Sequence, residues 1–314
     1  MTDALPYPVQ DTFQRSLTCE LTTIDSRGRP ITWPVTPFYR PGDEHISVTT
    51  GLGWPKKARD AARNQHVALL FSDPTGSGIA RPSMVLVQGT AEVDDADLDA
   101  NRKRYARDTA AKFSREESPA RPARFDWYFT RIYIHVRPER VYIWPGGDCE
   151  ADPELIELSS PAGSLPHTGT QAPRSKPSGS TRRVHELGRR YDTAVLSVVA
   201  HDGYPFSIRV PVSVDRRGNE IRIDATPAPA LPLLAGPACV TAHDHDDELE
   251  WSRNFQVRGQ LVGDRSGWTV TPDQVVDGFE LPPVGPLTRT VYNFRKIRRF
   301  RRTAKAERAR RAAS

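Results

Sequence analysis

The stretch Asp25-Ser26-Arg27-Gly28-Arg29-Pro30, which leads into an alternating run over 31–39, decides the fold because a second stretch of the same pattern follows later in the chain. Its counterpart Ala200-His201-Asp202-Gly203-Tyr204-Pro205 leads into a second alternating run over 206–215. A glycine turn followed by alternation predicts a β-hairpin. The later strands repeat too, because Val87-Gln88-Gly89-Thr90-Ala91 matches Val257-Arg258-Gly259-Gln260-Leu261. The sequence therefore predicts two related β-domains.

The two copies differ after their third strand. Copy one continues with Thr49-Thr50-Gly51 and then Lys56-Lys57-Ala58-Arg59, whereas residues 224–234 of copy two are rich in Pro, Ala and Leu. Hydroxyl groups, cations and helix-terminal amides can together hold a phosphate. Lys57 and Arg59 are the first candidates for this role, and Lys56 is the alternative donor if the register shifts by one. A solvated basic helix face is the other interpretation. We expect one anion site, in copy one only.

Composition limits the class of protein. The 314 residues suffice for two domains of roughly 150 residues, each with its own core. No run approaches the length of a membrane span, so we expect no membrane partner. Cys19, Cys149 and Cys239 are far apart and odd in number, which indicates neither a disulfide framework nor a zinc site. The N-terminus lacks the pattern of a signal peptide, and we expect a cytoplasmic protein.

The net charge of +5 comes from the C-terminal end, where residues 295–311 hold ten Lys or Arg against one Glu. We expect a final strand or helix start over 290–300 and then a basic tail over 301–314, a solvated and fraying helix. Binding of nucleic acid through this tail is the alternative, but no aromatic platform or nucleic-acid module accompanies the charge.

The expected organisation follows from composition and periodicity. It comprises an N-terminal arm over 1–14, a first domain over 15–148, a flexible linker over 149–183, and a second, degenerate domain over 184–300. The linker is assigned because residues 159–183 are rich in Pro, Gly, Ser and Thr and have almost no large apolar residues. Short strands with few helices favour a barrel over a parallel sheet.

The ordered motifs resemble the split β-barrel proteins, the pyridoxamine 5′-phosphate oxidase-like and deazaflavin (F-420)-dependent reductase families. The motifs that carry the resemblance are Asp25 to Pro30, Pro34-Val35, Thr50-Gly51 with Lys57-Ala58-Arg59, His66 to Leu70, Val87 to Ala91, and Pro138-Glu139-Arg140-Val141 before Trp144. The resemblance covers about residues 15–146 and, at the level of the fold, 190–265. It implies a mainly β (α+β) fold, in which two tandem split β-barrel domains form a pseudo-dimer, as a monomer or a homodimer.

In that family the cofactor lies between two paired barrels. The resemblance therefore implies one bound F-420 (deazaflavin) or FMN, and the residues do not decide between them. It implies that the cofactor phosphate is bound by Thr49, Thr50, Gly51, Lys56, Lys57 and Arg59. It also implies that the cofactor ring lies beside Trp33, Pro34, Val35 and Thr36, and that Gln88 forms a hydrogen bond with the ring. A core position for Trp33 and an exposed strand amide for Gln88 are the alternatives. Leu231 to Ala235 would cover the groove.

The run His243-Asp244-His245-Asp246-Asp247 is the remaining candidate cluster. His243 and His245 alternate and would share one face of a strand, but no converging ligands from other segments are identifiable. We expect a polar loop and no metal, with a haem ligand as the lesser alternative.

Two hypotheses about function follow. The first is a flavin- or deazaflavin-dependent oxidoreductase that transfers a hydride between the bound cofactor and an unknown small-molecule substrate, because in such enzymes the cofactor carries the chemistry. The second is a non-catalytic flavin, deazaflavin or haem binding or carrier protein. The loss of the anion site in copy two fits a carrier as well as it fits an enzyme.

Overall fold

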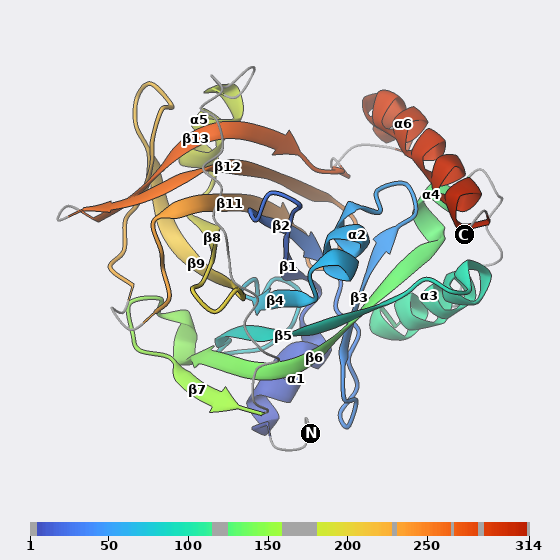
Figure 1. The fold of residues 1–314 in the computed structure, drawn as a ribbon, viewed down its shortest axis with the longest axis horizontal. Coiled ribbons are helices and arrows are strands. Elements are labelled where there is room, and N and C mark those ends of the chain that lie inside the picture. The colour runs from blue at the N-terminus through green and yellow to red at the C-terminus, as the bar shows by residue number, and fades with distance from the viewer. Residues whose placement is uncertain are drawn as a thin grey trace.

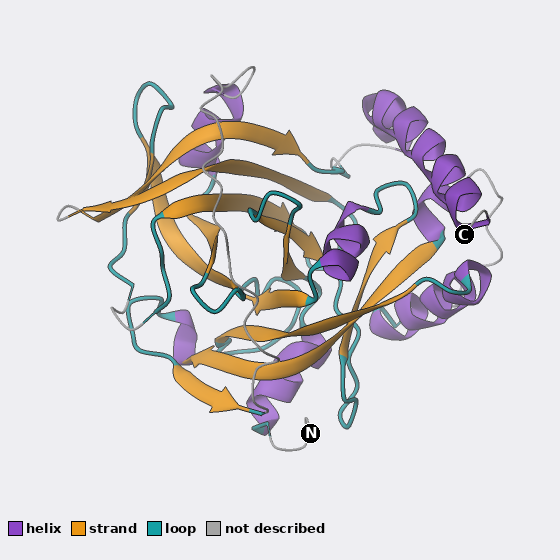
Figure 2. Cartoon of the chain, viewed as in Figure 1, coloured by secondary structure: helices purple, strands orange, loops and turns teal. Residues whose placement is uncertain are grey.

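The computed structural model describes residues 5–114, 125–158, 181–227, 231–264, 267–281 and 286–312. Most of the predicted linker, residues 159–180, lies outside the described residues. Two β-structures, one from each half of the chain, pack against each other (Figures 1 and 2). The prediction of a mainly β, duplicated fold is confirmed.

The first half forms a seven-stranded antiparallel sheet in the order β2-β1-β4-β5-β6-β3, with β7 beside β6. A bridge between Phe38 and Ser47 joins the chain after β2 to β3, so the sheet curls toward closure. The elements are α1 (Tyr7–Arg15), β1 (Cys19–Ile24), β2 (Pro30–Val35), β3 (Ile46–Gly51), α2 (Lys56–Arg63), β4 (His66–Phe71), β5 (Met84–Asp94), α3 (Leu98–Lys112), α4 (Asp126–Phe129), β6 (Arg131–Trp144), the 3-10 turn η3 (Pro145–Gly147) and β7 (Glu154–Glu157).

The second half forms a closed barrel in the order β10-β13-β12-β11-β8-β9. When the six main strands are numbered within each half, both halves have the same strand order. The duplication seen in the sequence is therefore also present in the topology. The elements are α5 (Thr181–Arg190), β8 (Thr193–Val199), β9 (Pro205–Val214), β10 (Ile221–Ile223), β11 (Gly236–His245), β12 (Ser252–Asp264), β13 (Gly267–Asp277) and α6 (Pro286–Ala312).

The two halves have the same backbone geometry at positions that match in the sequence. Gly28 and Gly203 both adopt a positive φ, 73° and 83°, in the first hairpin turn of each half. The pairing register shifts beside Gly89 in β5 and beside Gly259 in β12. A Cβ at either glycine would lie 2.1 Å from a carbonyl oxygen of the next strand, so both β-bulges require glycine.

Between the halves lies a ring of hydroxyl groups. Thr22 and Thr32 from the first half meet Ser197 and Ser207 from the second, and all four residues are fully buried. Neighbouring oxygens around the ring are 2.7–2.9 Å apart. Polar side chains on β1, β2, β8 and β9 therefore face the other half rather than solvent.

The N-terminal region is more ordered than expected. Residues 7–15, most of the predicted arm, form α1, whose Phe13 is completely buried. The Phe13 ring packs against Tyr39 and Phe71, with centroids 5.4 and 4.8 Å apart. Burial of this aromatic ring holds α1 against the first half.

The C-terminal region also differs from the expectation. One helix, α6, spans both the predicted end of the second domain and the predicted tail, and it packs against α4 of the first half (Figure 1). Ala304 of α6 is buried in the core of the first half. Glu307 is also buried, and it accepts hydrogen bonds from Arg310 and Arg311 of α6 and from Arg59 of α2. Among the described helices, none combines the length and the apolar composition that a bilayer crossing requires.

Candidate functional site

The predicted anion site lies where β3 ends and α2 begins. Thr50 is fully buried, and its hydroxyl donates to the carbonyl oxygen of Trp54 at 2.9 Å. Thr49 is also buried, in the same strand. A Cβ on Gly51 would lie 3.0 Å from both the Trp127 carbonyl oxygen and the Trp54 ring. Thr50 and Gly51 therefore shape the turn that leads into α2.

Two of the three predicted cations already have carboxylate partners. The Lys56 ammonium lies 2.6 Å from Asp60 on the next turn of α2, and about half of its side chain is exposed. Arg59 contacts Glu307, which α6 contributes from the end of the chain. Both cations are therefore neutralised within the folded protein.

Lys57 differs from its neighbours. Its ammonium lies 5.8 Å from the centroid of the Trp33 ring, a cation–π contact. Among the described carboxylates, none lies within ion-pair distance of it. Burial, followed by the nearby positive charge of Arg131, lowers the pKa of Lys57 to about 7. Lys57 is thus a partly buried cation that senses the positive charge of Arg131.

Arg131 is the residue that sequence reasoning missed. It begins β6, pairs with Gly51 of β3, and is 6% exposed. Its guanidinium donates to the Tyr105 hydroxyl at 2.7 Å and stacks on the rings of Tyr105 and Tyr128. Its Nε is buried without a hydrogen-bond partner. The only sequence signal was an arginine two residues after the aromatic run 127–129, and the pairing of β3 with β6 is not local.

The predicted ring-binding strand is β2, which packs against β11 and β12 of the second half. Trp33 and Pro34 are partly buried, as is Thr36 just after the strand, and Val35 lies in the first core. Gln88 is not an exposed amide: it is 1% exposed, and its Nε2 donates to the carbonyl oxygen of Pro205 at 2.8 Å. The fold therefore brings Lys57 and Trp33 together, whereas Gln88 joins the two halves.

The apolar segment of the second copy does not match its predicted role. Leu231 belongs to the core of the second half, and Leu233 packs against that core. The described residues between β10 and β11 contain no helix equivalent to α2. These leucines therefore fill the second half.

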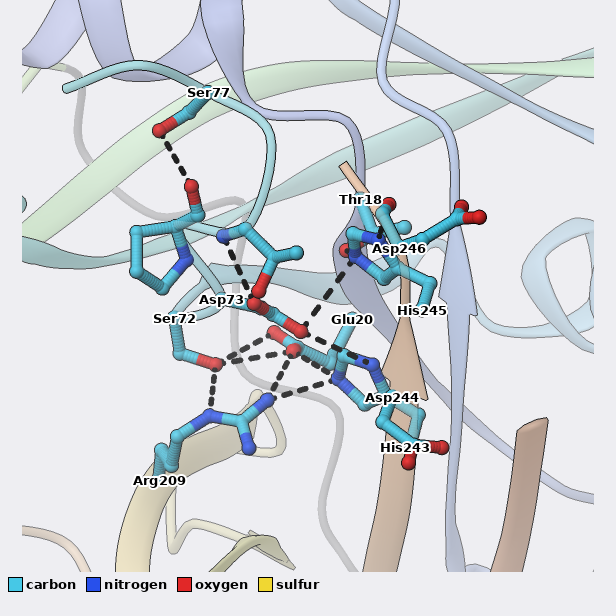
Figure 3. A network of polar contacts seen from close by, with 12 residues as sticks. Thr18, Glu20, Ser72, Asp73, Ser77, Arg209, His243, Asp244, His245 and Asp246 are labelled. Atoms are coloured by element: carbon cyan, nitrogen blue, oxygen red, sulfur yellow. Dashed lines mark hydrogen bonds and ion pairs between the residues drawn. The ribbon is translucent and has the colours of Figure 1, made fainter. Parts of the chain in front are cut away.

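His243 and His245 were expected in a polar loop, and this prediction is wrong. Both lie on β11 with parallel rings 6.4 Å apart, and both are buried. The shared strand face is confirmed. His243 Nε2 lies 2.5 Å from Glu20 and 2.8 Å from Arg209, and His245 accepts from or donates to Thr18 at 3.0 Å (Figure 3). Both histidines are interface residues because β11 packs against the first half.

In this network, hydrogen bonds and nearby positive charges stabilise the ionised forms of the carboxylates of Glu20 and Asp73. Glu20 is fully buried, which alone would raise its pKa, but the His243 hydrogen bond and the charges of His243 and Arg209 lower it. Asp73 behaves similarly: its pKa is lowered despite burial, chiefly by His243. Ser72 donates to Glu20 and accepts from Arg209. Within the described part of the chain, no three His, Cys, Asp or Glu side chains converge as metal ligands.

A cavity of about 400 Å³ adjoins this network. Both halves line it, the first through the segment after β4 and the second through Arg209 and the residues after β10. Its position is distinct from Lys57 and Trp33, neither of which lines it.

Comparison with protein-family models and with curated proteins gave no match. Among solved structures, a putative pyridoxamine 5′-phosphate oxidase from Listeria innocua is 15% identical with a TM-score of 0.32, over 43% of this chain and 94% of its own. General stress protein 26 from Bacillus anthracis is 17% identical with a TM-score of 0.31, over 48% and 98%. An F420 reductase is 20% identical with a TM-score of 0.32, over 44% and 98%. The chain is thus similar over about half its length to proteins of the families that its motifs resemble, and the likeness concerns the fold alone.

Proposed function

We propose that the protein binds a flavin-type cofactor, FMN or the deazaflavin coenzyme F-420, with the cofactor phosphate at Lys57, and that it acts as an oxidoreductase on a small molecule. The observation that carries this proposal concerns two desolvated cations, Lys57 and Arg131. The charge of Arg131 acts on Lys57, and no described carboxylate forms an ion pair with either residue. A cationic group that burial has partly desolvated, that has no counter-ion and whose pKa is lowered as a result is typical of a binding site.

The residues present fit an anionic cofactor. A phosphate at Lys57 would supply the missing negative charge, and Arg131, whose charge acts on Lys57, has a buried Nε–H without a hydrogen-bond partner. Trp33 offers an aromatic surface next to the same ammonium. The bound cofactor would supply hydride transfer, while the chain would supply position and charge.

The direct test is titration of the full chain with FMN and, separately, with F-420, followed by ring fluorescence. Lys57→Met should weaken binding by about tenfold or more, the loss of one charge-assisted contact. Lys56→Met is the matched control, because Lys56 is exposed and already paired with Asp60, and it should change the affinity by less than about twofold. Equal losses in the two variants, or no saturable binding of either cofactor, would overturn the proposal.

A second readout separates binding at Lys57 from binding elsewhere. Since the pKa of Lys57 is about 7, an incoming phosphate should raise it and draw a proton from the buffer at pH 7–8. Calorimetry in two buffers of different ionisation enthalpy measures this uptake. Wild-type protein should take up a fraction of a proton per cofactor, and Lys57→Met should take up less.

A non-catalytic carrier is the second candidate, favoured by the neutralisation of Arg59 by Glu307. Turnover separates the two candidates. The complex with reduced cofactor is mixed with a panel of quinones and α,β-unsaturated carbonyl compounds, and reoxidation is followed without oxygen. Acceptor-dependent acceleration that Lys57→Met removes supports an enzyme, and unchanged rates with every acceptor support a carrier.

A further inference from the structure

The cavity between the two halves occupies a symmetry-related place in the fold. Asp224 and Ala225 follow β10, and both line the cavity. In the repeat they correspond to Thr49 and Thr50 at the end of β3, because 220–223 matches 45–48. The cavity is therefore the second copy's counterpart of the region beside Lys57.

The charge of this region is opposite to that of the Lys57 region. Arg209 is the one described cation in the cavity wall, and its guanidinium is already engaged. It donates to Glu20 at 2.9 Å and to Ser72 at 2.9 Å. Four carboxylates also line the cavity, contributed by Asp73, Asp148, Glu150 and Asp224.

Asp73 is the carboxylate best placed to meet a ligand. Its side chain is 13% exposed, and Oδ1 accepts from the Thr75 amide at 3.0 Å. Its other oxygen, Oδ2, lies 3.6 Å from His243 and 3.5 Å from His245, beyond hydrogen-bond distance for a strong contact. Asp73 therefore forms only long ion-pair contacts with the two histidines, and its Oδ2 keeps hydrogen-bond accepting capacity in a partly desolvated place, where a charge pair is stronger than in water.

The rest of the wall is largely apolar. Phe71, Ile79, Pro82, Met84 and Pro211 contribute to it. A volume of about 400 Å³ lies within the range of small-molecule sites, roughly 300–1,000 Å³. Such a wall suits a compact apolar body, and the carboxylates suit a positive charge attached to it.

We infer that this cavity binds a small organic cation, an amine or quaternary ammonium group on a compact apolar body. The apolar wall holds the body, and Asp73 and Asp224 neutralise the charge. An anion is disfavoured because Glu20 already satisfies the single arginine. The inference does not rest on the proposed cofactor site, since the two sites share no residue.

The test uses the full chain without cofactor and three probes of similar size: benzyltrimethylammonium, benzyl alcohol and phenylacetate. Ligand-observed NMR and calorimetry give the dissociation constants. The cation should bind saturably and about tenfold more tightly than benzyl alcohol, as for one partly desolvated charge pair. Phenylacetate should bind most weakly.

Variants locate the binding. Ser83→Trp and Ala225→Leu, which fill the cavity from the first and second half, should abolish it. Asp73→Asn and, at the exposed rim, Asp224→Asn should each weaken it by threefold or more, whereas Glu154→Gln on the exposed strand β7 removes an equal charge and should leave it unchanged. Thermal unfolding confirms that each variant is folded. Equal affinity for the cation and phenylacetate, or binding that survives both filling variants, would overturn the inference.

Discussion

Thr22 and Ser197 occupy equivalent positions in the two halves of the chain, and their hydroxyl oxygens lie 3.5 Å apart across the interface. With Thr32 and Ser207 they form a closed ring in which each hydroxyl can donate one hydrogen bond and accept one. The repeat thus brings matching polar residues together on its own pseudo-two-fold axis.

Thr22→Val keeps the shape of the side chain but opens the ring, and the buried hydroxyl groups of Thr32 and Ser207 each lose one of their two hydrogen bonds. It should lower the free energy of unfolding by about 1–3 kcal/mol, measured by urea denaturation. Thr23→Val is the matched control, because the neighbouring Thr23 hydroxyl is buried without a partner. That variant should be neutral or stabilising, and equal losses at 22 and 23 would contradict a role for the ring.

Glu20→Gln should destabilise the interface between the halves. It removes a fully buried carboxylate from contact with Arg209 and His243, and breaking a buried pair in this way costs about 3–5 kcal/mol. Because the folded-state pKa of Glu20 is lowered, its contribution is complete above the unfolded value of about 4.5. The contribution is lost as pH falls through the folded value. The difference between wild type and Glu20→Gln in urea denaturation should therefore shrink below pH 4.5, whereas Glu154→Gln should show no such difference.

Lys57→Met should stabilise the protein while it weakens cofactor binding. The pKa of Lys57 falls from an ordinary 10.5 to about 7 on folding, so the unfolded chain binds more protons between these values. Stability therefore rises with pH across that window, and the charged lysine is unfavourable below it. At pH 6 the variant should gain about 1–3 kcal/mol in the free energy of unfolding, and the gain should diminish toward pH 10. Lys56→Met should show neither effect, and a pH-independent gain would contradict the assignment.

The duplication could be predicted from sequence because its evidence is local. Glycine turns, the bulges at Gly89 and Gly259, and the α2 segment are each encoded within a few neighbouring residues. The anion site could be predicted only in part. Lys57 is local to its motif, but Arg131 reaches it through the pairing of β3 with β6, which no short motif encodes.

The polar interface could not be predicted, for a physical reason. All six residues of β1 are buried, yet they alternate like a strand with one solvated face. In a single barrel, Glu20 and Thr22 would point to water. Here the second half covers that face, so the polar residues meet His243, Arg209 and the serine hydroxyls instead. An alternating pattern specifies two different faces and leaves open what covers the polar one.

Glu307→Gln should loosen α6 from the first half. Glu307 is 1% exposed and accepts hydrogen bonds from Arg59 and Arg310, and these bonds lower its pKa to about 2. The amide keeps the shape but loses the charge, so amide hydrogen exchange in α6 should accelerate by about tenfold, one lost charge-assisted contact. Because the folded pKa lies below the unfolded one, wild-type α6 should also loosen as pH falls from 4.5 toward 2. Arg302→Gln, on an exposed position of the same helix, should leave exchange unchanged. If Glu307→Gln also leaves it unchanged, apolar contacts such as that of Phe300 with Trp54 are what hold the helix in place.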